Sequence, residues 1–272
     1  MSLILLLFVS AGYYITSFSE QDNAELIVAE EGVIVSFADL KTEPSGGRST
    51  NHILKREYIT LSNNDSTKFA DWVAYRLTKE IINGPKRRRK WEADPALTDA
   101  ETLEPNDYKK AHKMLETDRG HQAPLGSFDG WREWQTVNYL SNITPQKSAL
   151  NQGPWRALEE RVRLLVEKYD SVYVMTGPYY QDTMPALPKA DESHVIPSGY
   201  WKIVVISTDG KGHITSFLFS QETPRSDQVV DHITSVDSIE TITGLNFFEN
   251  VEDSVEEKIE QQIFKQAWYG DM

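Results

Sequence analysis

The sequence lacks cysteine altogether: none of its 272 residues is one. This absence excludes disulfides, thiolate metal sites and a cysteine nucleophile. It does not identify the compartment, because exported proteins can also lack cysteine. Any catalytic chemistry must therefore use oxygen and nitrogen side chains, and stability must come from packing.

The chain also lacks an excess of basic residues, since 28 lysines and arginines face 41 acids and the net charge is −13. Taken alone, this charge argues against a polyanionic substrate. The acids are concentrated at the ends: residues 1–43 hold seven acids and one lysine, and residues 249–272 hold seven acids and two lysines. Residues 44–248 are close to neutral, so basic patches there can still attract phosphate.

No apolar run is long enough for a typical membrane span, which needs roughly 20 residues. The longest begins at Leu3 and continues to about Phe18, and the small residues Ser17 and Ser19 precede Glu20. This pattern predicts a signal peptide over residues 1–19, although no lysine or arginine precedes the apolar run. The alternatives are an uncleaved membrane anchor and a buried terminal strand. We expect an exported protein, secreted or periplasmic, or else one anchored to a membrane and facing outward.

The hydrophobic content of 39% is that of an ordinary globular protein. Residues 20–49 read as an acidic segment and linker, residues 50–250 as the main domain, and residues 251–272 as an acidic amphipathic helix. Within the main domain, hydrophobic spacing predicts helices over 69–82 and 155–169. Strands are expected at 58–61, 172–175, 201–206 and 214–219. The fold class is α+β, with a mixed or antiparallel central sheet flanked by helices.

A short motif, Asp118-Arg119-Gly120-His121, combines an acid, a base, a flexible glycine and a titratable imidazole. His121 can accept a proton near neutral pH, and Arg119 can pair with phosphate. By itself the motif is weak evidence, because a lone histidine is more often structural.

The segment that follows strengthens the case. Residues 139–154 are rich in asparagine and broken by proline, which is typical of a loop, and they lead into the helix predicted over 155–169. Glu159 and Arg163 are four residues apart and share one face of that helix. They form either a surface ion pair or a carboxylate and a guanidinium held at a site.

Together these segments resemble the Serratia-type non-specific nuclease family, whose active site is the ββα-metal motif. The order and spacing of many separate motifs over about residues 50–250 carry the resemblance. The matching segments are residues 68–75, 94–97, 118–124, 142–148, 150–153, 176–178, 196–198 and 200–202.

The resemblance implies a role for each candidate residue. His121 matches the general base that deprotonates water, and Asn151 matches the direct protein ligand of a hydrated Mg²⁺. Glu159 matches an acid that holds a water of the metal's hydration shell. The remaining matches are Arg89, Arg119 and Arg163 as phosphate-contacting or positioning bases, and Asp118, Asn142 and Gln146 as supporting polar residues.

The resemblance also implies an endonuclease that cleaves DNA and RNA with little sequence or sugar preference and leaves 5′-phosphate ends. Mg²⁺ is the expected metal, with Mn²⁺ as an alternative, and relatives are often homodimers. The membrane is a partner only if the N-terminal segment stays uncleaved. Two departures stand out: the disulfides of many relatives are absent, and Pro154 follows Gly153 where a kink is expected if the helix begins near Ser148.

Other interpretations remain for some residues. The run Lys86-Arg87-Arg88-Arg89-Lys90 is either a solvated basic loop or a phosphate-binding segment in which the neighbours of Arg89 strengthen substrate capture. His52, His112 and His232 have no motif support, and His194 and His213 are expected to be structural. Trp155 is expected to anchor the core.

The sequence disfavours two other functions. A catalytically weak, nucleic-acid-binding pseudonuclease is disfavoured because His121 and Asn151 are both present. A carboxylate-pair hydrolase acting on glycans is disfavoured because no acid pair has a context as specific as that of residues 118–163.

Overall fold

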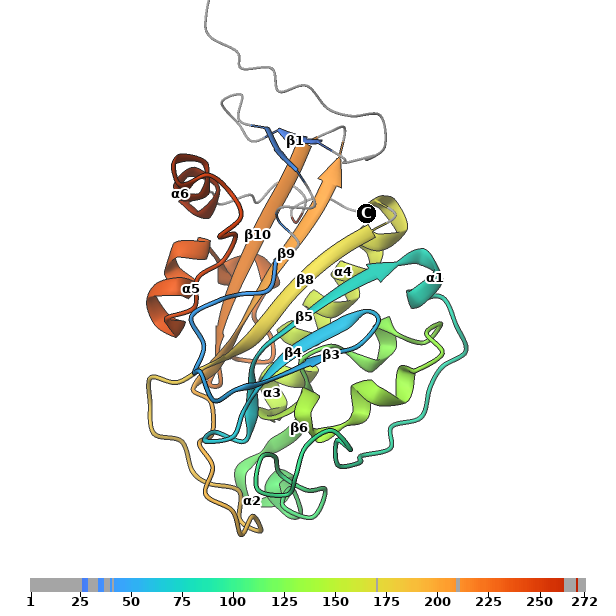
Figure 1. The fold of residues 1–272 in the computed structure, drawn as a ribbon. Coiled ribbons are helices and arrows are strands. Elements are labelled where there is room, and N and C mark those ends of the chain that lie inside the picture. Colours follow the sequence, from blue (N-terminus) through green and yellow to red (C-terminus); the bar gives the residue numbers. More distant parts are fainter. Residues whose placement is uncertain are drawn as a thin grey trace, which may run out of the picture.

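A central antiparallel sheet organises the computed structural model (Figure 1), which describes residues 26–28, 34–36, 40, 42–169, 171–208, 211–261 and 268. Seven strands pair in the order β11-β10-β9-β8-β5-β4-β3. Their bounds are β3 His52–Lys55, β4 Ile59–Asn64, β5 Phe69–Thr78, β8 Ser171–Tyr179, β9 Gly199–Thr208, β10 Lys211–Ser220 and β11 Ile233–Thr234. The predicted α+β class is confirmed, with helices on both faces of this sheet.

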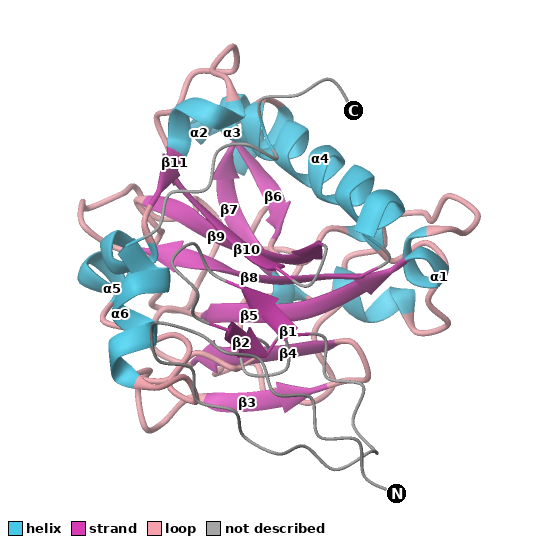
Figure 2. Cartoon of the chain, turned by 90° about the horizontal axis from the view of Figure 1, so that it is seen from above, coloured by secondary structure: helices cyan, strands magenta, loops and turns pink. Residues whose placement is uncertain are grey.

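The two faces of the sheet carry different helices (Figure 2). The longest helix, α4 (Pro154–Tyr169), lies across β5, β8 and β9 on one face. On the opposite face lie α5 (Val236–Thr243) and α6 (Asp253–Gln261), whose buried side chains join Trp201 and Ile203 of β9 in a second core. Because strand side chains alternate between faces, neighbouring residues of one strand serve different cores.

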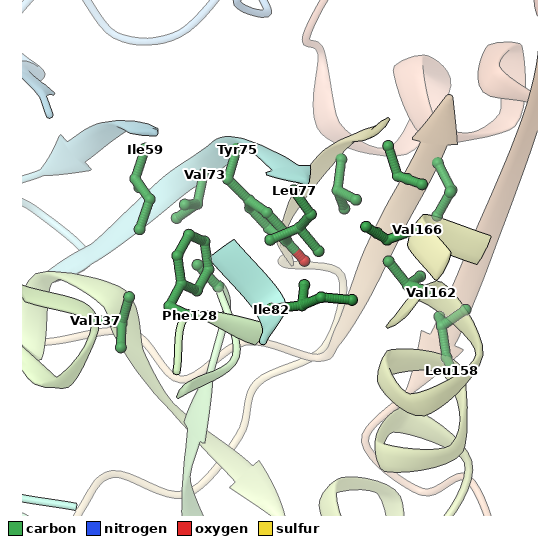
Figure 3. Packing of buried hydrophobic residues seen from close by; sticks show 14 of the residues in the cluster. Ile59, Val73, Tyr75, Leu77, Ile82, Phe128, Val137, Leu158, Val162 and Val166 are labelled. Carbon is green, nitrogen blue, oxygen red and sulfur yellow. The ribbon is translucent and has the colours of Figure 1, made fainter. Parts of the chain in front are cut away.

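The core beneath α4 joins distant parts of the chain (Figure 3). Leu158, Val162 and Val166 of the helix and Tyr75 of β5 are buried there together with Phe128 from a connecting segment. The rings of Tyr75 and Phe128 meet edge to face, with centroids 5.7 Å apart. This packing fixes both ends of the candidate site, because α4 and the segment around Phe128 each border it.

The segment predicted as a helix over 69–82 is mostly strand, and that prediction is wrong. Residues Phe69–Thr78 form β5, and only Lys79–Ile82 form a short helix, α1. Trp72 faces one core while Val73, Tyr75 and Leu77 face the other. A central strand buried on both faces has a nearly continuous apolar sequence, which can imitate helical spacing.

A separate two-stranded ribbon stands beside the main sheet. Strands β6 (Thr117–His121) and β7 (Ile143–Lys147) pair antiparallel, with His121 opposite Ile143. The chain then enters α3 (Ser148–Gln152), breaks at Gly153 and resumes as α4 from Pro154. The break is tight, because a Cβ at Gly153 would lie 2.6 Å from the carbonyl oxygen of Ala149 and 2.7 Å from that of Arg225. The helix therefore does begin at Ser148, with the expected interruption before Pro154.

The remaining elements are short. They are β1 Leu26–Val28 paired with β2 Ile34–Ser36, α2 Ala111–Leu115, and the 3-10 helices η1 Leu125–Ser127, η2 Trp134–Asn138, η3 Leu140–Asn142 and η4 Val229–His232. The segment 139–147, expected as a loop, is thus a 3-10 turn followed by a strand that tolerates Pro145. A proline is accepted in a two-stranded ribbon when its nitrogen faces away from the partner strand.

The predictions for the two chain ends fall partly outside the described residues. The predicted signal peptide or anchor, residues 1–19, lies outside the described residues. Among the residues that are described, no helix combines the length and apolarity needed to cross a membrane. Near the C-terminus, α6 matches the first part of the helix expected over 251–272.

Candidate active site

A cleft of about 610 Å³ opens where the β6–β7 ribbon meets α3 and the start of α4. Six of the nine predicted site residues line it: Arg89, Asp118, Arg119, His121, Asn151 and Glu159. Asn142, Gln146 and Arg163 lie outside this lining. The sequence motifs, up to 70 residues apart along the chain, therefore meet on one concave surface.

The His121 ring is held from two sides at the end of β6. Its Nε2 lies 3.3 Å from the side-chain oxygen of Asn138, a buried residue of η2. The indole of Trp91 packs against the ring, with centroids 5.1 Å apart. Because an amide oxygen only accepts, Nε2 carries the proton and donates it to Asn138. This tautomer leaves Nδ1 with a free lone pair, and Nδ1 has no hydrogen-bond partner within the described part of the chain.

The surroundings of His121 keep its imidazole neutral. Burial lowers the pKa of His121 to about 4; the hydrogen bond to Asn138 opposes this effect, and the positive charge of Arg89 adds to it. At neutral pH the ring is therefore unprotonated and able to accept a proton.

Asn151, on α3, has its amide orientation set by Asp118 on β6. Its Nδ2 donates to Asp118 Oδ2 at 3.0 Å. Because the nitrogen side of the amide is used in this way, the oxygen Oδ1 is turned from Asp118 and has no protein partner among the described residues. The half-buried Asn151 thus presents one neutral oxygen to the cleft.

Asp118 collects three further hydrogen bonds. Gln152 Nε2 donates to Oδ2 at 2.8 Å, Ser148 Oγ donates to Oδ1 at 2.9 Å, and His112 Nδ1 lies 2.9 Å from Oδ1. Burial by itself would raise the pKa of Asp118, but the hydrogen bonds from Gln152, Asn151, Ser148 and His112 outweigh it and lower the pKa. The carboxylate is therefore ionised at neutral pH and fixes the first turn of α3 to β6.

Glu159 lies in the second turn of α4, and a buried lysine lies behind it. Lys202 of β9 is fully buried, with 0% of its surface exposed. Its Nζ donates to the Tyr75 hydroxyl at 3.3 Å and lies 4.5 Å from the centre of the Trp155 ring. Burial raises the pKa of Glu159, and the positive charge of Lys202 is the largest influence that opposes the rise. Lys202 thus favours the ionised form of Glu159 from inside the core.

The three predicted arginines occupy different environments. Arg89 is exposed at the rim of the cleft. Arg119 donates to the Pro105 carbonyl at 2.8 Å and lies over the rings of Tyr108 and Trp91 at 5.2 and 5.6 Å. Arg163 donates to Ser127 Oγ at 3.4 Å, which places it behind the cleft wall.

The basic run before Trp91 does not act as one patch. Arg87 donates from Nε to the Asp129 carbonyl at 2.9 Å and packs over the Trp134 ring at 5.2 Å. Its contacts attach the segment to the protein, whereas Lys86 and Arg88 are exposed. The expectation that Arg87 serves substrate capture is therefore not supported by its contacts.

Asn142 and Gln146 lie beneath the cleft rather than in it. Asn142 accepts from the Ala123 amide at 2.9 Å and donates to the Ala123 and Val137 carbonyls at 2.9 and 2.8 Å. Gln146 is buried against Gly120, where a Cβ would lie 2.6 Å from Gln146 Oε1. Both side chains shape the backbone that carries His121, and glycine is required at position 120 because the glutamine lies across it.

Three residues of the site were missed or set aside at the level of sequence. His112, which had no motif support, contacts Asp118 and lines the cleft. Asn138 could have been suspected only from its place four residues before Asn142. Lys202 belongs to a segment that matches the family. A lysine in a strand is expected to face solvent, and the neighbouring residues do not predict its burial. Trp155 anchors the core as expected, 1% exposed against Tyr200 and Phe219.

Comparison with known proteins finds related sequences. The pattern of the DNA/RNA non-specific endonuclease family matches residues 38–254. The chain is 46% identical to "Nuclease" of Serratia marcescens over 222 residues, covering 80% of this chain and 83% of that protein. It is 28% identical to human "Endonuclease G, mitochondrial" over 211 residues, covering 72% and 69%.

Among solved structures, a chain from the EndoG/EndoGI complex superposes with a TM-score of 0.65. It shares 24% sequence identity, and the match covers 76% of this chain and 89% of that one. At this identity the likeness concerns the fold.

The neutral state of His121 leads to a measurable prediction. In protein kept free of divalent metal, a histidine ring titration by NMR should place the pKa of His121 well below 6.5, near 4. Arg89→Gln should raise that pKa, because the positive charge that disfavours the imidazolium is removed. Lys86→Gln, an exposed change in the same segment, should leave it unaltered. A pKa at or above 6.5 in the unaltered protein would contradict the account of the site.

Proposed function

The chain belongs to the DNA/RNA non-specific endonuclease family and is an endonuclease, and from this premise we propose how its cleft works. We propose that it hydrolyses phosphodiester bonds of DNA and RNA with little preference for sequence or sugar and leaves 5′-phosphate ends. The observation that carries the proposal is that two unpartnered acceptors, His121 Nδ1 and Asn151 Oδ1, belong to one cleft of about 610 Å³.

His121 acts as the general base. Nδ1 removes a proton from a water molecule, the water oxygen attacks phosphorus, and the bond from phosphorus to the 3′-oxygen breaks. The leaving oxygen takes a proton from solvent in the cleft. Although the pKa of His121 is low in the free protein, a bound phosphate places negative charge beside the ring and favours its protonated form.

A divalent metal, Mg²⁺ with Mn²⁺ as an alternative, is proposed to bind at Asn151. The donor set fits such an ion, because Oδ1 is the free oxygen of an amide that Asp118 orients, and magnesium prefers few protein ligands and keeps most of its water. When bound, the metal would stabilise negative charge on the phosphate oxygens. Asp118 is a positioning residue in this scheme, since its hydrogen bond keeps the oxygen of Asn151 toward the cleft.

Glu159 and the arginines complete the proposed site. The Glu159 carboxylate accepts hydrogen bonds from water in the cleft, and the charge of Lys202 opposes the rise that burial causes in its pKa. Arg89 and Arg119 attract and position the phosphate, and Arg163 contributes positive charge from behind. Contacts of this kind read the sugar-phosphate backbone, which accounts for low sequence preference.

We also propose export, with membrane anchoring through an uncleaved N-terminal segment as the alternative. The domain bounds 50–250 and assembly as a homodimer are proposals as well. The pseudonuclease alternative is disfavoured by the cleft itself, because His121, Asn151 and Glu159 all line it.

The role of His121 is tested by substitution. His121→Ala should reduce plasmid nicking by a factor of 10² or more, because general-base assistance is worth about 10²–10⁴-fold. Circular dichroism and thermal unfolding should show that the variant still folds. The control is His52→Ala, an exposed histidine of β3 outside the cleft, which should nick at the rate of the unaltered protein. Full activity in His121→Ala would remove it as the base.

The metal site is tested by titrating Mg²⁺ into the nicking assay. Asn151→Ala should lose most activity, and Asp118→Asn should need roughly 10–100 times more Mg²⁺ for half-maximal rate, the usual effect of removing a group that orients a ligand. Asp99→Asn, an exposed loop change, should behave like the unaltered protein. An unchanged Mg²⁺ requirement in both site variants would exclude the proposed ligand and its support.

A further inference from the structure

A second group of acidic side chains lies on the far side of the central sheet from the cleft. Helices α5 and α6 pack side by side there, away from α3 and α4 (Figure 1). Asp237 and Glu240 of α5 and Glu260 of α6 each place one carboxylate oxygen so that the three lie within 4.8 Å of one another. The nuclease mechanism makes no use of these residues.

The packing of the two helices explains why the acids converge. Val236 and Ile239 of α5 and Ile259 of α6 are buried in the core beneath the helices. Asp237 and Glu240 are three residues apart and share one side of α5. Glu260 directly follows Ile259, so burial of the isoleucine draws the glutamate inward, and only 6% of its surface is exposed.

Glu260 is buried with one oxygen unpartnered, and its carboxyl group lies against that of Glu240. Its Oε1 accepts no hydrogen bond, and neither does the buried Oε1 of the neighbouring Glu256. Glu240 is held in place, because the Phe247 amide donates to its Oε1 at 2.8 Å. Across the described ranges, no lysine or arginine forms an ion pair with any of these acids. A buried carboxyl oxygen without a donor is costly, and no basic side chain offsets that cost here.

The acids also repel one another. Burial, followed by the charges of Glu240, Glu256 and Asp237, raises the pKa of Glu260 to about 8. The pKa values of Glu240 and Glu256 are raised as well, mainly by burial and by the surrounding acids Asp237, Glu240, Asp253 and Glu249. The charged groups that raise the pKa of Glu260 are thus all acids of the two helices.

We propose that the α5–α6 junction is a binding site for one calcium ion, with Asp237, Glu240 and Glu260 as its carboxylate ligands. The ion links the two helices and stabilises the C-terminal part of the domain. This function is independent of the nuclease cleft, and its failure would leave the catalytic proposal unaffected.

The chemistry of the ligands favours calcium over magnesium. Calcium accepts 6–8 oxygen ligands at about 2.3–2.6 Å in flexible geometry, so two ligands of one ion can stand up to about 5 Å apart. The three oxygens all lie within 4.8 Å of one another, which fits this range. Magnesium requires nearly ideal octahedral geometry and usually binds through one or two carboxylates, which suits a cluster of three less well.

Calorimetric titration with CaCl₂ tests the site directly. The full chain carrying Asn151→Ala, which weakens the proposed nuclease metal site, should bind one calcium ion. Adding Glu260→Gln should remove that binding event or weaken it at least tenfold. The matched control Glu257→Gln changes an exposed glutamate on the outer side of α6 and should bind as before.

Thermal unfolding separates a cation site from a simple proton-sharing pair. At roughly 100 times its Kd, calcium should raise the Tm of the Asn151→Ala protein on the order of 5 °C relative to EDTA. Glu260→Gln should abolish this gain. Equal Tm values with calcium and with EDTA, or an undiminished calcium response in Glu260→Gln, would overturn the proposal in favour of carboxyl groups that share protons.

Discussion

The hydrogen bond from Asn151 to Asp118 is the constraint on which the site depends. It joins the first helix after the β6–β7 ribbon to the strand that carries His121, and it selects which atom of the asparagine faces the cleft. An amide that is free to rotate would offer nitrogen as often as oxygen. The three other donors on Asp118 keep its carboxylate ionised and fixed in place. One acid of the cleft wall thus positions the ligand.

The central sheet sets the electrostatics of the site from below. Alternation along β9 sends Trp201 and Ile203 to the far core and Lys202 toward α4. A buried lysine is costly unless it is paired, and here the Tyr75 hydroxyl, the Trp155 ring and the charge of Glu159 offset that cost. The same scaffold keeps His121 neutral, because burial and Arg89 disfavour its charged form. A neutral imidazole thus lies in one cleft with a glutamate whose charged form Lys202 favours against the effect of burial.

Sequence reasoning predicted the fold class, the helix over 155–169, the strands that became β8, β9 and β10, and six residues that line the cleft. It failed at β5, where burial on both faces removed the alternation that marks a strand. It also read β7 as a loop, since the unpaired edge that accommodates Pro145 is a tertiary feature. Asn138 and Lys202 were missed for a similar reason, because their roles arise from contacts between residues far apart in the sequence.

The central claim is that an oriented amide and a neutral imidazole meet one metal-bearing phosphate site. Anomalous diffraction from crystals soaked in MnCl₂ tests it most directly. The account predicts a manganese peak in the cleft, bonded to Asn151 Oδ1 and to no other protein atom, with the Nδ2 group still on Asp118. A manganese ion bonded to the His121 ring, or a cleft that stays empty while manganese binds elsewhere, would contradict it.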